Sequence, residues 1–284
     1  VLGTKDYFQK TGHAKALLGL SGGIDSAIVA TLAVAALGKE AVTGVLMPSR
    51  YSSLGSVEDA EQLAKNLGIE TVTLPIEHMH SAFERTISDS CLEAKGLAEE
   101  NAQARIRGLL LMALANQNGA LLLSTGNKSE LAVGYSTLYG DMSGAVSVIG
   151  DIYKTDVWSM ATWMNNHFET CGFELAPIPK SSIMKPPSAE LRPGQLDQDS
   201  LPEYAELDSI LRLHIDLDMG VDTIEEELGA ERDFIQKIVH MVDIAQFKRD
   251  QTAVIFKTSP RSFGRGRRMP IVMKRSWTTV REAT

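Results

Sequence analysis

The sequence predicts an α/β protein in which a doubly wound parallel sheet is followed by C-terminal helices. Short apolar runs alternate with longer stretches of helix formers over the first 150 residues, a pattern typical of right-handed crossovers and of a sheet covered on both faces. The 284 residues, 44% of them hydrophobic and 23% charged, are enough for a full core. This length allows one large domain or about two.

The elements follow from local signals. Strands are expected at 15–20, 41–47, 70–74 and 120–123. Helices are expected at 27–37, at 57–67 behind a capping box of Ser56 and Asp59 and ending at Gly68, and at 99–118. Further helices are expected at 155–167, 203–213 and 231–247. Six prolines fall within 177–202, so this segment is expected to be a long loop that acts as a lid.

Composition excludes several classes of protein. The net charge of −8 argues against a general nucleic-acid binder, and the longest apolar runs, at 109–115 and 120–123, fall short of the ~20 residues of a membrane-spanning helix. Cys91 and Cys171 cannot form a disulfide framework or a CxxC metal site, which favours a reducing, cytoplasmic location. Because the chain starts at Val1 without a signal-like segment, we expect a cut edge or a longer parent chain.

The segment 19–26, GLSGGIDS, joins a predicted strand to a predicted helix. Its small residues let backbone N–H groups converge on an anion, and the helix N-terminus adds positive potential. A glycine-rich connecting turn remains the alternative, since neither GxxxxGK[ST] nor GxGxxG is present. Asp25 would repel a phosphate unless a cation lay between them, so the loop implies Mg²⁺.

SGGIDS resembles the SGGxDS signature of the ATP pyrophosphatase superfamily, whose members cleave ATP between its α- and β-phosphates and form adenylates on an adenine nucleotide alpha hydrolase-like fold. Segments 47–53, 101–107 and 123–155 resemble NAD⁺ synthetase, most closely the synthetase domain of the glutamine-dependent form. The resemblance implies that deamido-NAD, ATP and ammonia give NAD⁺, AMP and pyrophosphate. Another adenylating ATP pyrophosphatase, or a catalytically silent nucleotide-binding module, remains the alternative.

The resemblance also implies site residues. The ATP-binding set is Gly19, Leu20, Ser21, Gly22, Gly23, Ile24, Asp25, Ser26, Thr125, Lys154 and Ser188. Asp25 and Glu130 are the Mg²⁺ ligands, and Asp25 and Lys154 are the catalytic pair. Plainer alternatives are a strand-end hydroxyl for Thr125, a helix-capping residue for Glu130, a solvated lysine for Lys154 and an N-cap for Ser188.

Asn101, Arg105, Glu130 and Lys248 are the implied deamido-NAD contacts, with a solvated polar face as the alternative for Asn101, Arg105 and Lys248. Leu138 and Ala145 stand where ammonia-dependent synthetases carry a lysine and an aspartate. This departure puts the contacts of 135–145 in question.

Expected partners follow from the same family. The chain is expected to form a homodimer with deamido-NAD near the interface, and to receive ammonia from a glutaminase domain or subunit that is absent here. The basic tail, 249–284 with its arginines from Arg261 onward, is expected to dock on protein rather than to bind nucleic acid. We expect Cys91 to be an ordinary helical cysteine despite nearby Glu93 and Lys95. The histidines at 78, 80, 167, 214 and 240 show no metal-binding spacing and are expected to be structural or exposed.

Overall fold

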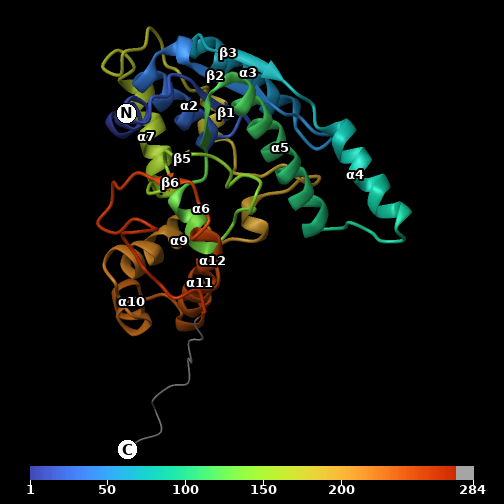
Figure 1. Ribbon diagram of the computed structural model, residues 1–284. Helices are drawn as coiled ribbons and strands as arrows, with labels where there is room; N and C mark the ends of the chain where they lie inside the picture. The colour runs from blue at the N-terminus through green and yellow to red at the C-terminus, as the bar shows by residue number, and fades with distance from the viewer. Residues whose placement is uncertain (273–284) are drawn as a thin grey trace, which may run out of the picture.

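The computed structural model describes residues 1–272 and confirms the doubly wound α/β architecture (Figure 1). Six parallel strands form one sheet in the order β3-β2-β1-β4-β5-β6. They are β1 (Ala16–Gly19), β2 (Val42–Leu46), β3 (Glu70–Thr73), β4 (Leu121–Ser124), β5 (Val146–Ser147) and β6 (Val254–Ile255). The order reverses between β1 and β4, where open α/β sheets typically bind their ligands.

Helices cover both faces of the sheet because successive strand side chains point to opposite sides. Ala16 and Leu18 belong to a core shared with α2 and α3, whereas Leu17 lies in a second core with Ala115 of α5. The helices around the sheet are α1 (Leu2–Thr11), α2 (Ile24–Leu37), α3 (Leu54–Leu67), α4 (Glu77–Asp89), α5 (Leu97–Asn118) and α7 (Lys154–Asn166). The central strands β1, β2 and β4 are therefore buried on both faces, as is typical of parallel sheets, whereas the edge strand β3 is largely exposed.

A third core lies in the C-terminal helices, which form the lower part of the molecule in Figure 1. These helices are α9 (Tyr204–Leu211), α10 (Val221–Leu228), α11 (Arg232–Ile244) and α12 (Gln246–Arg249). Helices α9, α11 and α12 pack against α6 (Lys128–Val133), and α10 packs against α11. A π-helical turn, Arg212–Asp216, follows α9 directly. Among residues 1–272, no helix combines the length and apolarity needed to cross a bilayer.

Several predicted boundaries are wrong by a few residues, and some elements were not predicted. Helix α3 begins one turn earlier than expected because Ser53, not Ser56, is its cap: Ser53 Oγ accepts the Ser56 N–H at 3.1 Å. The sequence analysis missed β5 and β6, which have two residues each, and α1, α4, α6 and α10. Two-residue strands are too short to show a period of two.

The proline-rich segment 177–202 contains a short helix, α8 (Lys180–Met184), and a 3-10 turn, Asp197–Asp199. Cys91 also differs from its prediction, because it lies in the turn after α4 with φ of +57° and not in a helix. Glu93 and Lys95 are exposed and pair with each other at 2.5 Å. Their charges are therefore directed at each other at the surface.

Candidate functional site

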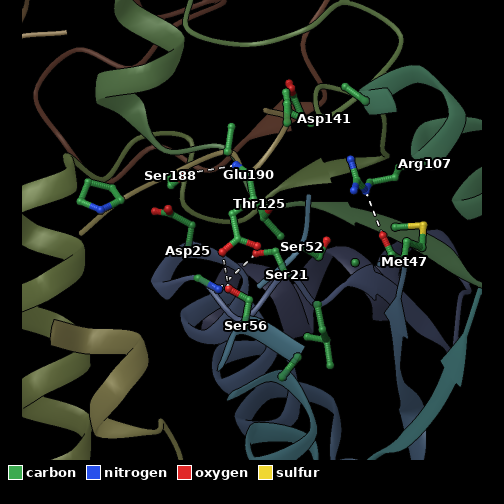
Figure 2. A pocket seen from close by; sticks show the side chains of 18 of the residues that line it. Ser21, Asp25, Met47, Ser52, Ser56, Arg107, Thr125, Asp141, Ser188 and Glu190 are labelled. Carbon is green, nitrogen blue, oxygen red and sulfur yellow. Dashed lines mark hydrogen bonds between the residues drawn. The ribbon is translucent and has the colours of Figure 1, made fainter. Parts of the chain in front are cut away.

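A cavity of about 310 Å³ opens at the carboxyl ends of β1, β2 and β4, close to the reversal of strand order (Figure 2). Its walls come from the loop after β1, the start of α3, the middle of α5 and the proline-rich segment. Segments far apart in sequence thus enclose one space. Pockets of this size accommodate small-molecule ligands.

The SGGIDS loop forms the floor of this cavity and depends on a glycine at position 22. Gly22 has φ of +79°, and a Cβ there would lie 2.1 Å from the Ser56 carbonyl oxygen. Ser26 Oγ donates to the Gly23 carbonyl at 3.0 Å, and the Gly23 N–H donates to Ser21 Oγ at 3.2 Å. These contacts fix the loop at the N-terminus of α2, where backbone N–H groups favour an anion.

A cluster of opposite charges stands beside the loop. Lys154 Nζ forms ion pairs with a carboxylate oxygen of Asp25 and, at 3.3 Å, with Glu130 Oε1. Asp25 also accepts a hydrogen bond from Asn127 Nδ2 at 3.0 Å. The Lys154 side chain is only 2% exposed, so the solvated lysine considered as an alternative is wrong. Its two carboxylates supply the anionic partners that a lysine in the first turn of a helix needs.

In this cluster burial and the oppositely charged neighbours act in opposite directions on the pKa of Glu130, and likewise on the pKa of Lys154. Burial raises the pKa of Glu130 to about 8, although nearby Lys154 opposes the shift. Burial alone would lower the pKa of Lys154, but Asp25 and Glu130 outweigh it and the pKa is raised. Asp197, which reaches the cluster from the proline-rich segment, has a pKa raised by burial. Three carboxyl groups therefore surround one ammonium group.

This donor set fits Mg²⁺. The cluster offers hard carboxylate oxygens, and its acidic groups outnumber its single cation, so a divalent ion would relieve the excess negative charge. Glu130 also completes a capping box with Asn127 at the start of α6. Glu130 therefore does cap the helix, as the alternative stated. Only one of its oxygens, Oε2, accepts the Asn127 N–H, and the other, Oε1, faces Lys154.

Most of the predicted ATP-binding residues line the cavity. From that set the lining includes Gly19, Leu20, Ser21, Gly23, Ile24, Asp25, Thr125, Lys154 and Ser188, and the proposed metal ligand Glu130 lines the cavity as well. Gly22 and Ser26 do not line it and instead hold the loop in shape. Ser188 Oγ donates to the Gln195 carbonyl at 2.5 Å and accepts the Glu190 N–H at 3.1 Å, so it closes a turn and caps no helix.

The predicted dinucleotide contacts gather around a neighbouring loop. Asn101 accepts a hydrogen bond from Thr137, Arg105 donates to the Leu138 carbonyl at 3.2 Å, and Lys248 Nζ donates to the Gly134 and Ser136 carbonyls at 2.7 Å each. None of the three lines the cavity itself. They lie around 134–138, and Tyr135 of this loop lines the cavity together with Gly140 and Asp141 farther along the chain.

Several charged residues that line the cavity were not predicted as site residues, among them Arg107, Asp141, Glu190 and Asp197. Arg107 donates to the Met47 carbonyl at 3.1 Å, and burial lowers its pKa to about 10. Burial raises the pKa of Asp141 to about 6. Glu190 bridges the lid to α3, and Asp197 joins the Lys154 cluster. Arg107 and Asp141 lie in the segments 101–107 and 123–155 that carry the family resemblance, whereas Glu190 and Asp197 lie in the proline-rich segment with no signal of their own.

The sequence of this chain is similar to those of known NAD(+) synthetases. The chain is 52% identical over 272 residues to a glutamine-dependent NAD(+) synthetase of Synechocystis, matching 95% of this chain and 47% of that protein. It thus spans about half the length of the curated relatives it matches.

The solved structures that align with this chain include NAD synthetases. A glutamine-dependent NAD⁺ synthetase from Acinetobacter baumannii, in complex with ADP, aligns with a TM-score of 0.61 and 40% identity over 94% of this chain and 47% of that one. An NH3-dependent NAD synthetase from Campylobacter jejuni aligns with a TM-score of 0.66 and 28% identity over 87% of this chain and 91% of that one. The NAD synthase family model matches residues 1–252. The chain therefore belongs to the NAD synthase family.

Proposed function

We propose that the chain catalyses ATP-dependent amidation of deamido-NAD to NAD⁺ through an adenylated intermediate, releasing AMP and pyrophosphate. One observation carries this proposal: Asp25 of the SGGIDS loop lies next to Lys154, which also pairs with Glu130, and all three side chains line the cavity. Family membership supports the reaction class. A module that only binds nucleotide would have no need of a buried charge cluster facing its ligand.

In the first step the nicotinate carboxylate attacks the α-phosphorus and pyrophosphate leaves. The N–H groups at the start of α2 hold the phosphates, and Asp25 and Glu130 would hold Mg²⁺ beside them. When bound, Mg²⁺ neutralises charge on the pyrophosphate. Lys154 brings a buried ammonium group near the same developing charge, where low local polarity strengthens its effect.

In the second step ammonia attacks the acyl carbon and AMP leaves. Water would compete with ammonia, so the intermediate must be shielded. The segment 177–202 suits this task, because its residues Pro186 to Leu191 form one wall of the cavity. We propose that it opens for ATP and closes over the intermediate. Ser188 and Thr125 would contact the nucleotide from opposite walls.

Deamido-NAD would bind beyond the cavity, near the 134–138 loop. Asn101, Arg105 and Lys248 surround that loop and would position the dinucleotide. On the same helix as Arg105, Leu109 is 60% exposed and Met112 is 40% exposed. We propose that this apolar part of α5 pairs with a second copy of the chain and places deamido-NAD close to the dimer interface.

Ammonia would come from a glutaminase domain or subunit, because the matched relatives are named glutamine-dependent and are about twice as long. Cys91 and Cys171 are free thiols, which suits a reducing cytoplasmic location. The exposed Glu93–Lys95 pair does not activate the Cys91 thiol as a nucleophile. We therefore expect this chain to use ammonium salts and not glutamine.

The test is an assay of the purified chain with ATP, Mg²⁺, deamido-NAD and either ammonium chloride or glutamine. We expect equal amounts of NAD⁺ and pyrophosphate with ammonium, faster at alkaline pH where more NH₃ is present, and no NAD⁺ with glutamine. Binding of ATP without pyrophosphate release would identify a silent module. NAD⁺ formed from glutamine by the Cys91→Ala and Cys171→Ala variants would contradict the need for a separate ammonia source.

A further inference from the structure

A second cluster of chemistry-bearing side chains lies away from the cavity, between α4 and α5. His80 and Glu84 are one turn apart on α4, and Glu99 comes from the first turn of α5. One ligand atom from each of these three residues lies within 4.8 Å of the other two. The sequence analysis could not find this group, because its third member is on another helix.

His80 is the feature that requires an explanation. Its side chain is completely buried, yet neither ring nitrogen has a hydrogen-bond partner. Nε2 points toward Glu84, with 3.9 Å between Nε2 and Oε1, too far for a hydrogen bond. Buried polar groups are nearly always satisfied, so an orphaned imidazole facing two carboxylates indicates a missing ligand.

The local charge balance points to a cation. Arg50 pairs with Glu77 at 2.5 Å and with both oxygens of Glu84 at 3.0 Å. Glu99 accepts a hydrogen bond from the uncharged Tyr51 hydroxyl at 2.8 Å. One guanidinium group thus pairs with two carboxylates, Glu77 and Glu84, and the third carboxylate, Glu99, is bound by an uncharged hydroxyl. A divalent ion would bring this cluster to neutrality.

We propose that His80, Glu84 and Glu99 form a binding site for a divalent transition-metal ion of the zinc class. One imidazole nitrogen with two carboxylate oxygens is a ligand set that Zn²⁺ accepts, and water would complete a tetrahedral shell. Ligand atoms in such a shell are ~3.4 Å apart, given metal–ligand bonds of about 2.1 Å. The three ligand atoms here lie within 4.8 Å of one another, and rotation of the half-buried Glu84 and Glu99 side chains would bring them to this shorter spacing.

Metal at this site would fasten α4 to the N-terminal end of α5. Arg50 and Tyr51, which hold Glu84 and Glu99, lead directly into Ser52, a residue of the cavity wall. The site therefore stabilises one rim of the cavity without contributing a group to the reaction. It is separate in ligand chemistry from Asp25 and Glu130, which offer oxygen alone.

The experiment titrates the EDTA-treated, desalted chain with Zn²⁺ and with Co²⁺ in the presence of excess Mg²⁺. Calorimetry gives the stoichiometry, the visible absorption of Co²⁺ reports its geometry, and thermal unfolding reports stabilisation. Four variants are compared: His80→Gln, Glu99→Gln, His78→Gln and Asp25→Asn. His78 is the matched control, because it is exposed on the same helix. Asp25→Asn separates the new site from the proposed Mg²⁺ centre.

We expect one equivalent of Zn²⁺ in the unmodified chain and in the His78→Gln and Asp25→Asn variants. His80→Gln and Glu99→Gln should bind at least about 100-fold more weakly and lose the Co²⁺ bands. Absence of binding to the unmodified chain, or unchanged affinity in Glu99→Gln, would overturn the proposal. Glu99→Gln alone decides the question if His80→Gln fails to fold, since Glu99 is only partly buried.

Discussion

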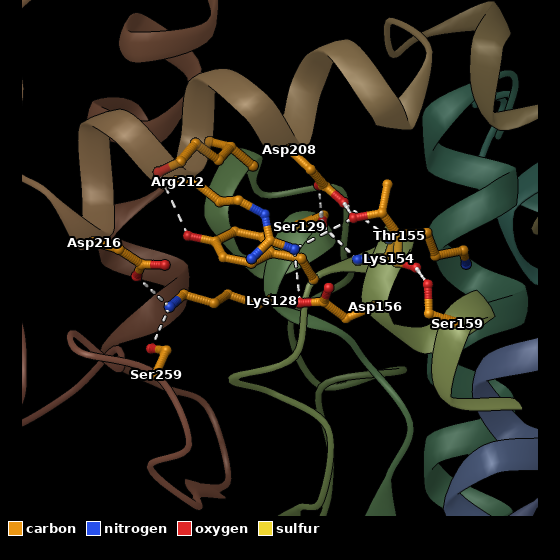
Figure 3. A network of polar contacts seen from close by, with 12 residues as sticks. Lys128, Ser129, Lys154, Thr155, Asp156, Ser159, Asp208, Arg212, Asp216 and Ser259 are labelled. Atoms are coloured by element: carbon orange, nitrogen blue, oxygen red, sulfur yellow. Dashed lines mark hydrogen bonds and ion pairs between the residues drawn. The ribbon is translucent and has the colours of Figure 1, made fainter. Parts of the chain in front are cut away.

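Two buried lysines, the first residues of α6 and α7, each pair with two carboxylates but lie in different surroundings; Figure 3 shows Lys128 with Asp216 and Ser259. Lys128 forms ion pairs with Asp151 at 2.9 Å and Asp216 at 2.8 Å, and Lys154 forms them with Asp25 and Glu130. Both ammonium groups are at least 98% buried. Only Lys154 lines the cavity.

Lys128 is sealed on every side. Its Nζ also donates to Ser259 Oγ at 2.6 Å and to the Arg261 carbonyl at 2.9 Å, and it lies 4.7 Å from the centre of the Tyr153 ring. Asp151 in turn accepts the N–H groups of Thr258 and Ser259 at 2.7 Å each. This network fastens the described start of the basic tail to the body of the chain. Lys274 and Arg275 of that tail lie outside the described residues.

Burial alone does not distinguish a structural lysine from a functional one. A buried pair whose donors and acceptors are all satisfied holds the fold in one arrangement, whereas a buried pair with excess negative charge beside a cavity retains capacity for a ligand. Lys154 forms a buried pair with excess negative charge, because a third carboxylate, that of Asp197, also raises its pKa.

The largest expected effect is on catalysis. Asp25→Asn removes one proposed metal ligand but keeps a hydrogen-bonding side chain of the same size. We expect turnover to fall about 10³-fold or more, because several kcal/mol of transition-state stabilisation are lost. Steady-state assays at limiting Mg²⁺ measure this effect. Near-normal turnover would remove Asp25 from the reaction.

The second prediction concerns stability. Lys128→Met leaves Asp151 and Asp216 without their counter-charge in a sealed site, so we expect unfolding to become easier by about 3–5 kcal/mol. Denaturant unfolding measures the loss. Adding Asp216→Asn should restore part of it. The two lysines would not differ as we describe if Asp25→Asn destabilised the chain more than Lys128→Met.

The third prediction follows from the pKa of Glu130, which burial raises to about 8. Protonated Glu130 cannot bind a metal, so below that pH Mg²⁺ affinity should fall by up to about tenfold per pH unit and should level off above it. Measuring the apparent Mg²⁺ dissociation constant from pH 6 to pH 9 checks this. Glu130→Gln should bind Mg²⁺ weakly and lose the pH dependence. An equally steep dependence in that variant would assign it to another group.

The smallest expected effect concerns the lid. The Glu190 carboxylate accepts hydrogen bonds from Ser53 Oγ at 2.9 Å and Ser56 Oγ at 2.7 Å. Glu190→Gln should weaken this latch and raise proteolysis of 177–202 about two- to tenfold without ligand. The exposed Glu203→Gln serves as the control. ATP with deamido-NAD should suppress cutting in both; equal cutting with and without ligand would remove the lid.

The sequence predicted the parts of the molecule that local patterns encode. The alternation of strands and helices and the SGGIDS loop are local, so the sheet and the floor of the cavity were predictable. The partners of Lys154 were named only through family resemblance, since Asp25 and Glu130 are 105 residues apart and meet through the sheet. Asp197 and the environment of His80 depend on tertiary packing, which no periodicity records.

The proposed reaction requires the nicotinate carboxylate to attack ATP at the α-phosphorus within this cavity. The experiment uses deamido-NAD labelled with ¹⁸O in both oxygens of that carboxylate and analyses by mass the AMP formed in the presence of ammonium chloride. We predict that each AMP carries one ¹⁸O atom and that NAD⁺ retains the other. Unlabelled AMP would contradict the adenylated intermediate and, with it, the assigned function of the Lys154 cluster.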